Sequence, residues 1–156
     1  MKLKKCLRVL SMILVLVSIS CKSTPKQEPI QVYVMVYDYE NNALKGVTIF
    51  EDNKEIGQTD IYGRFTFEPK NTSEINLKFQ KVGYEIVYIN DSLNENQVLY
   101  VKMGNGKYYA ELAEELLDKK EFESALIAIN KALKCEQRKD YEYLKTIIIG
   151  ENKNEN

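Results

Sequence analysis

Short runs of β-branched and aromatic residues alternate with turn residues between positions 30 and 103. This spacing is typical of a small antiparallel β-sandwich. Phe65 and Phe67 alternate with polar neighbours, which indicates a strand that buries one face. The first run is apolar on both faces, so we expect it to be central or covered. Strands are predicted at 30–37, 46–51, 54–58, 64–68, 74–82, 84–90 and 97–103.

After Gly104 the apolar residues follow a helical period instead. Two helical faces are predicted from Tyr109, Leu112, Ala113 and Leu116, and from Phe122, Ala125, Ile129, Ala132 and Leu133. A third amphipathic segment follows Asp140, a candidate N-cap. The pattern predicts two antiparallel helices and a capping helix within 106–149, and a disordered polar tail at 150–156. The predicted fold class is therefore α+β, a sandwich followed by a helical unit.

The first twenty residues have a basic start and then an apolar run at 9–19. A run of eleven residues is too short to cross a bilayer, which takes about twenty. The layout predicts a signal peptide at 1–20 and an exported protein. Residues 22–29 contain two prolines and no apolar side chain, so 21–29 is predicted to be a flexible N-terminal tether.

The end of the signal, Ser20-Cys21-Lys22, resembles the lipobox of bacterial lipoproteins. The resemblance implies that Cys21 receives a diacylglycerol, becomes the first residue of the mature chain and anchors it to a membrane. Lys22 resembles the residue that follows the cysteine in lipoproteins sent to the outer membrane. Ser18 and Ser20 also suit ordinary signal peptidase, so a soluble periplasmic or secreted protein remains the alternative.

The chain has no histidine, which removes Ser-His-Asp, Cys-His and His-ligated metal chemistry. Asp38, Glu40 and Asn42 have the spacing of calcium ligands, but the glycine and bidentate glutamate of such loops do not follow, and a turn explains them better. We expect no catalytic residue, no metal and no cofactor, and hence a protein that is not an enzyme.

Charge argues against nucleic acid as a partner. The signal holds four of the 22 basic residues and none of the 23 acidic ones, so the chain from residue 21 has a formal charge of −5. Phosphate binding depends on basic patches, and the sequence shows no run of basic residues there.

The segment 59–67 combines a turn at Asp60 and Gly63 with a strand of alternating Phe. Together with 44–49 and 81–84 it resembles the carboxypeptidase regulatory-like domain, a transthyretin-like sandwich related in architecture to immunoglobulin domains. The resemblance covers residues 30–103 and implies a fold and a location, but not a reaction.

Residues 106–139 resemble a tetratricopeptide repeat. Its signature positions are occupied by Tyr109, Leu112, Ala113, Leu116, Phe122, Ala125, Ile129 and Ala132. Lys120 stands where the repeat prefers Gly, and Gln137 where it prefers Pro. In this family the first helix lines the ligand groove, which implies that Lys107, Ala110, Glu114 and Leu117 contact a partner.

These features predict a non-enzymatic, membrane-anchored envelope lipoprotein that acts as a protein-binding or assembly module. Its partner would be another envelope protein, and its oligomeric state is left open. The apolar surface of a single repeat must pack on the sandwich or dock a partner. The alternative function is a surface glycan or host-ligand binder that uses an aromatic face of Tyr33, Tyr37 and Tyr39, although such tyrosines also occur as ordinary strand residues.

Overall fold

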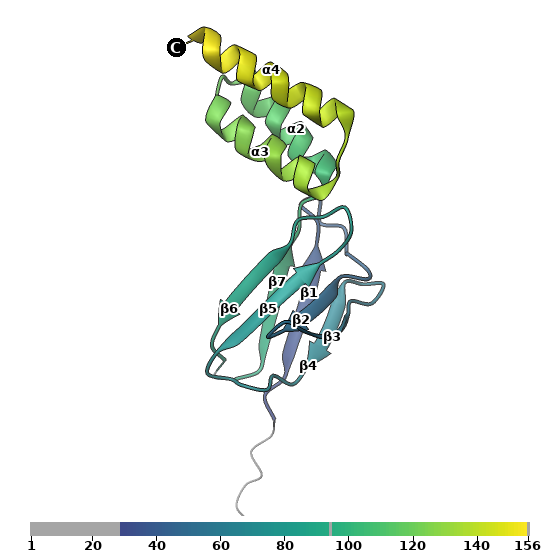
Figure 1. The fold of residues 1–156 in the computed structure, drawn as a ribbon. Helices are drawn as coiled ribbons and strands as arrows, with labels where there is room; N and C mark the ends of the chain where they lie inside the picture. Colours follow the sequence, from purple (N-terminus) through teal and green to yellow (C-terminus); the bar gives the residue numbers. More distant parts are fainter. Residues whose placement is uncertain (1–28, 94, 156) are drawn as a thin grey trace, which may run out of the picture.

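A computed structural model describes residues 29–93 and 95–155, so the predicted signal peptide and Cys21 lie outside the described residues. Seven strands precede three helices along the chain (Figure 1). The strands are β1 Val32–Tyr37, β2 Thr48–Glu51, β3 Lys54–Gln58, β4 Arg64–Phe67, β5 Ile75–Gln80, β6 Val87–Asp91 and β7 Gln97–Lys102. The helices are α2 Gly106–Asp118, α3 Phe122–Cys135 and α4 Lys139–Glu155. The α+β class and the β-sandwich are confirmed.

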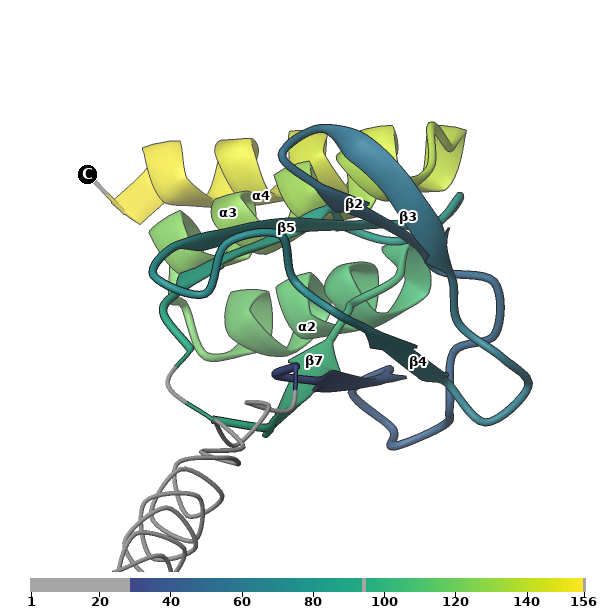
Figure 2. The same cartoon turned by 90° about the horizontal axis from the view of Figure 1, so that it is seen from below.

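The strands form two facing sheets, of order β4-β1-β7 and β3-β2-β5-β6. Figure 2 shows these two layers from below. Period-2 alternation sends the apolar residues of both sheets into the space between them. The most buried side chains of this core are Val32, Val34, Val36, Val47, Ile49, Ile75, Leu77, Phe79 and Met103. The first strand is central in its sheet, which is one of the two arrangements expected from its apolar faces.

The sandwich is not wholly antiparallel, and this part of the prediction is wrong. β1 pairs with β7 in parallel, with Val32 opposite Gln97 and Tyr37 opposite Lys102. Strand β6 belongs to one sheet and β7 to the other, and the crossing between them returns β7 in the direction of β1. Both strands therefore start at one end of the sandwich and finish at the other, where the helices begin (Figure 1).

The strand at 84–90 begins later than predicted, at Val87. The reason is that Tyr84 pairs with Asn105 and the Glu85 amide donates to the Gly104 carbonyl, at 2.8 Å. The two residues 84 and 85 therefore pair with the segment that leads into the helices, and not with β5.

The helices have a core of their own. Asn105 caps α2 by accepting a hydrogen bond from the Tyr108 amide, at 2.8 Å. The three-residue connection from Asp118 to Phe122 makes α2 and α3 antiparallel, and α4 packs mainly on α3. The buried residues of this second core are Tyr109, Ala110, Ala113, Ala125, Ala128, Ile129, Ala132, Tyr141 and Ile148.

Two predictions about the third helix are wrong. Helix α4 continues to Glu155, so 150–155 is helical and not a disordered tail. It starts at Lys139, which places Asp140 in the first turn rather than at the N-cap. There Asp140 forms a bidentate ion pair with Arg138, at 2.8 Å for the shorter contact. None of the described helices is long and apolar enough to cross a membrane.

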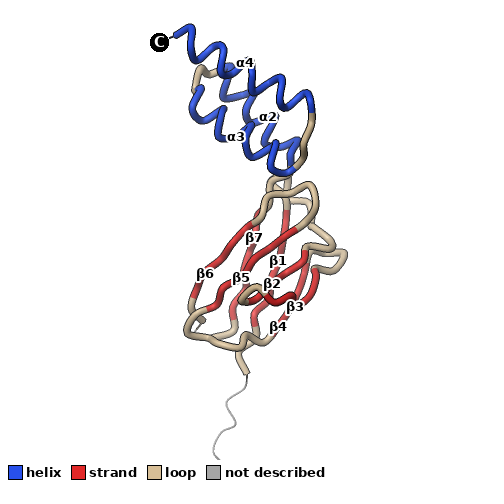
Figure 3. Tube along the Cα trace, viewed as in Figure 1, coloured by secondary structure: helices blue, strands red, loops and turns tan. Residues whose placement is uncertain are grey.

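The helical unit lies beyond one end of the sandwich, not against either sheet (Figures 1 and 3). The first described residues lie at the opposite end, because β1 and β7 run parallel. The helices therefore do not cover the tyrosine side chains of strand β1.

Candidate functional site

The sandwich and the helices meet at a polar cluster around Glu85. Its carboxylate accepts hydrogen bonds from the Gly104 amide at 2.9 Å and from the Tyr109 hydroxyl at 2.5 Å. Lys131 of α3 completes the cluster, with its Nζ 3.4 Å from Glu85 and 4.8 Å from the centre of the Tyr109 ring. One carboxylate thus links the β5–β6 connection to α2 and α3.

Two further contacts hold this junction together. The rings of Tyr39 and Tyr108 stack in parallel, with centroids 4.5 Å apart. Gly104 fits closely under Tyr109, because a Cβ atom at this position would approach the ring to 2.4 Å. Any side chain here would push the first helix away from the sandwich.

Burial changes the acidity of two groups at the junction. Desolvation, followed by the Glu85 carboxylate, raises the pKa of the Tyr109 hydroxyl well above its usual range. Desolvation also raises the pKa of the Cys135 thiol to about 11, with a further contribution from Glu85. A thiol that is neutral at physiological pH is a poor nucleophile, which makes Cys135 a packing residue.

A cleft opens beside this cluster, between the start of β6 and helix α3. It encloses about 320 Å³ and is lined by Tyr84, Glu85, Ile86, Tyr88, Lys131 and Lys134. We call it the junction cleft. Ile86 and Tyr88 are 46% and 67% exposed, so apolar and cationic groups face solvent side by side. Sequence reasoning missed this site because it joins residues more than forty positions apart that share no motif.

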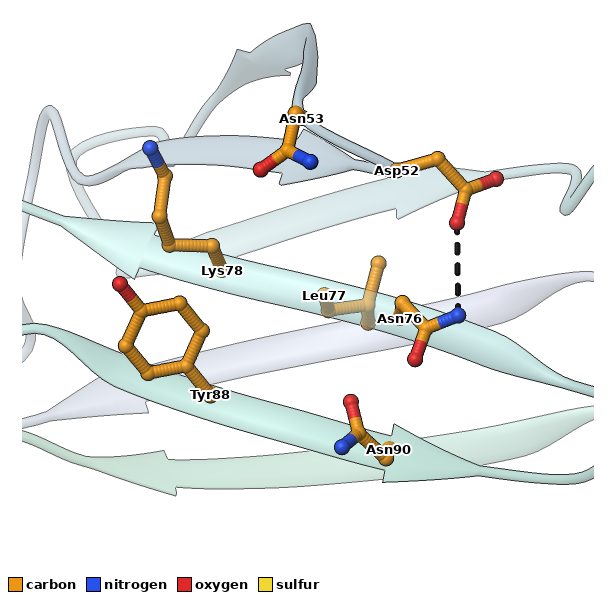
Figure 4. Close-up of a pocket in the computed structure, with 7 residues that line it drawn as sticks. All are labelled: Asp52, Asn53, Asn76, Leu77, Lys78, Tyr88 and Asn90. Atoms are coloured by element: carbon orange, nitrogen blue, oxygen red, sulfur yellow. Dashed lines mark hydrogen bonds between the residues drawn. The ribbon is translucent and has the colours of Figure 1, made fainter.

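A second depression, of about 220 Å³, lies on the outer face of the four-stranded sheet (Figure 4). Three of its seven lining residues are asparagines, and the Asn76 amide donates to Asp52 at 3.4 Å. Asp52 is the only acid among its lining residues, so the depression contains no carboxylate pair for acid–base catalysis. Glu51 is the most buried acid of the described chain. Its carboxylate accepts a hydrogen bond from the Lys70 amide and forms an ion pair with the Lys70 ammonium.

The predicted calcium-like residues form a turn. Asp38 Oδ1 accepts hydrogen bonds from the amides of Glu40 and Asn42, at 2.9 and 2.8 Å. The turn interpretation is confirmed. Within the described residues no group of three His, Cys, Asp or Glu side chains could hold a metal ion.

The four helical contact residues do not share one accessible surface. Lys107 and Glu114 are exposed, whereas Leu117 is half-buried against the helical core. Ala110 is only 7% exposed, which corrects its prediction as a contact residue. It lies on the inner face of α2 with Tyr109 and Ala113.

The predicted aromatic face is only partly formed. Tyr33 and Tyr37 point outward from β1, but Tyr39 lies past the end of the strand and stacks on Tyr108. The parallel register instead places Val98 beside Tyr33 and Tyr100 beside Met35. We call Tyr33, Tyr37, Val98 and Tyr100 the outer tyrosine face. Tyr100 is 71% exposed, and its place beside Met35 follows from the parallel pairing, which the pattern of a strand does not reveal.

No protein-family model matches the sequence, and no curated protein is significantly similar to it. Several solved structures align with about half of the chain. They include a cohesin–X-dockerin complex from Acetivibrio cellulolyticus (17% identity, 49% of this chain and 58% of that one, TM-score 0.43). The C-terminal domain of the PapC usher (13%, 47% and 98%, 0.36) and a shaft pilin SpaA from Lactobacillus rhamnosus GG (16%, 49% and 48%, 0.34) also align. At these TM-scores the likenesses carry no functional argument, and the sandwich assignment rests on the two packed sheets.

Proposed function

We propose that this protein is a non-enzymatic envelope lipoprotein, anchored through Cys21 to the outer membrane, which acts as a protein-binding or assembly module. One observation carries the proposal: the described chain begins at one end of the sandwich and the helical unit lies at the other. The six residues of β1 rise about 20 Å. A tether of eight residues adds on the order of 25 Å. An anchored sandwich would therefore present its helices far from the lipid surface.

We further propose that the sandwich is of the carboxypeptidase regulatory-like type and that the helices are a tetratricopeptide-like pair with α4 as the cap. The backbone of Lys120 supports the second assignment, because its φ of 62° is the left-handed conformation that favours glycine. This is the position where the repeat prefers Gly. The small residues Ala125 and Ala132 are fully buried between the helices, as close helix packing requires.

Exposed apolar side chains on the helices support a binding role. Ile127 on α3 is 63% exposed, and Tyr143 and Ile147 on α4 are 69% and 36% exposed. Tyr143 and Ile147 are four residues apart, so they lie on one stripe of the helix. A partner that covers this stripe would bury apolar area at roughly 25 cal/mol per Å². Lys107 and Glu114 remain the exposed candidates on α2.

Photo-crosslinking in intact cells tests the proposal. A photoreactive amino acid at Tyr143 should capture a specific envelope protein, and the same amino acid at Glu55, on strand β3 of the sandwich, should not. Glu55 is a suitable control because it is exposed and lies at an edge of the four-stranded sheet. Equal capture at both positions, or none at either, would contradict the binding role.

The anchor is tested separately by mass and by detergent partitioning. Acylation of Cys21 should add the mass of its lipids to the mature chain and move it into the detergent phase, because stable anchoring takes about two acyl chains. Cys21→Ser should leave the protein in the aqueous phase. A wild-type protein that stays aqueous would favour the soluble alternative.

The outer tyrosine face supports a second candidate function, glycan or host-ligand binding. Tyr33 and Tyr100 are 41% and 71% exposed on neighbouring strands, and tyrosine combines a flat apolar ring with a polar tip. Glycan-array binding should be lost in Tyr33→Ala and Tyr100→Ala and kept in Tyr143→Ala. Binding that survives the first two substitutions would eliminate this function.

A further inference from the structure

The junction cleft concentrates positive charge on a protein that is acidic as a whole. The chain from residue 21 carries a formal charge of −5, yet Lys131 and Lys134 line the cleft and Glu85 is its only lining acid. Lys134 forms no ion pair with any residue that the structure describes. The single carboxylate is already engaged by the Gly104 amide, Tyr109 and Lys131.

Two lysines of the sandwich neighbour the tyrosines of the cleft but do not line it. Lys78 is the cross-strand neighbour of Tyr88 and lies over the Phe50 ring, with Nζ 3.8 Å from the centroid. Lys81 Nζ lies 5.9 Å from the centroid of Tyr84 and donates a hydrogen bond to the Lys45 carbonyl at 2.8 Å. The positive charge at the opening therefore comes from Lys131 and Lys134 of α3, and it attracts an acidic ligand.

The cleft also offers aliphatic surface. Ile86 is 46% exposed in its wall, and Ile127 lies one turn before Lys131 on the same side of α3. Exposed aliphatic side chains beside lysines favour an acidic ligand that also carries apolar side chains. A space of about 320 Å³ accommodates side chains of an extended segment, not a folded domain.

We propose that the junction cleft binds an acidic peptide segment that carries apolar side chains, supplied by the partner protein. The acidic groups of the segment would face Lys131 and Lys134, and an apolar side chain would pack on Ile86 and Tyr88. This inference rests on the proposed protein-binding function and names the chemistry of the partner. It places the segment at a site that exists only where the sandwich and the helices meet.

The test uses the chain 21–156 with Cys21→Ser, labelled with nitrogen-15 and titrated with the peptide Glu-Glu-Leu-Glu-Glu-Leu-Glu-Glu. We expect amide shifts to change at 84–88 and 127–134, and binding to weaken as salt increases. Lys134→Ala should raise the dissociation constant about two- to fivefold, as expected for one exposed charge pair. Lys54→Ala should leave the dissociation constant unchanged. Lys54 is exposed on β3, which is the edge of the four-stranded sheet opposite to β6 and the cleft.

Three results would overturn the inference. One is equal binding of the peptide Lys-Lys-Leu-Lys-Lys-Leu-Lys-Lys. Another is an equal effect of Lys134→Ala and Lys54→Ala. The third is shift changes at the cleft with oligogalacturonate but not with the acidic peptide, which would identify the ligand as an anionic glycan.

The cell-based experiment separates this inference from the function on which it rests. Capture of a partner from Tyr143 together with failure of the acidic peptide would overturn the cleft assignment alone. Failure of capture from Tyr143 would overturn the binding function itself.

Discussion

Glu85 is the residue on which the junction depends most, because its carboxylate satisfies donors from both units. Replacing it with Ala leaves the Gly104 amide and the Tyr109 hydroxyl without their acceptor. We expect Glu85→Ala to lower the free energy of unfolding by about 2 kcal/mol, the cost of unpaired partly buried groups. Urea denaturation measures this change. Glu55→Ala, at an exposed position, should alter stability by less than about 0.5 kcal/mol, and equal effects would show that Glu85 has no special role.

The raised pKa values of Cys135 and Tyr109 predict that the protein loses stability at high pH. Both have pKa values raised in the folded state, to about 11 for Cys135, so folding favours their neutral forms. Their contribution to the free energy of unfolding is complete below the pKa of the unfolded thiol, near 9. This contribution is lost as the pH rises toward 11. The melting temperature should therefore fall between pH 9 and 11. Cys135→Ala should reduce this fall, and a Cys135→Ala protein with the same pH profile as the wild type would contradict the assignment.

The connection between α2 and α3 contains a strained residue. Lys120 has φ 62°, which glycine adopts without the clash that a Cβ atom causes. Lys120→Gly should raise the free energy of unfolding by about 1 kcal/mol, because it removes a left-handed non-glycine residue. Thermal unfolding followed by circular dichroism measures the gain. Gly150→Ala provides a useful comparison, since a Cβ atom there meets nothing within 4 Å and alanine is the better helix former. A loss of stability in Lys120→Gly would show that the lysine side chain matters more than the strain.

Strands and helices could be predicted because each carries its own period. Alternation around Phe65 and Phe67 identifies a strand, and the spacing of Ala125, Ile129 and Ala132 identifies a buried helix face. Alternation gives no information on which strand is the neighbour or on its direction. The parallel pair of β1 and β7 was missed for this reason, and with it the position of Tyr100. Ala110 was misplaced because alanine fits a contact surface and a helix core equally well.

The arrangement of the whole molecule lay beyond sequence reasoning. The described residues form two hydrophobic clusters, one in the sandwich and one in the helices, and the polar junction joins them. Glu85 and Lys131 are 46 positions apart, and neither belongs to a motif. Local patterns predict each unit separately, but the orientation between units depends on a few long-range contacts. The junction cleft follows from that orientation and was equally hidden.

If the junction contacts fix the two units relative to each other, removing one contact should loosen the whole molecule without unfolding either part. Tyr39 is suited to this test because it stacks on Tyr108 yet is 44% exposed and lies outside the strand. Residual dipolar couplings should fit one alignment tensor for both units of the wild type. For Tyr39→Ala they should require two tensors, with weaker alignment of one unit.

Tyr33→Ala is the matched control, because Tyr33 has a similar exposure, 41%, and lies on the outer tyrosine face away from the helices. It removes the same side chain and should keep the single tensor. An aromatic stack contributes about 1 kcal/mol beyond its buried area, which is enough to shift an orientational equilibrium about fivefold. Two tensors already present in the wild type would mean that the sandwich and the helices move independently, and that a ligand in the junction cleft would itself have to order them.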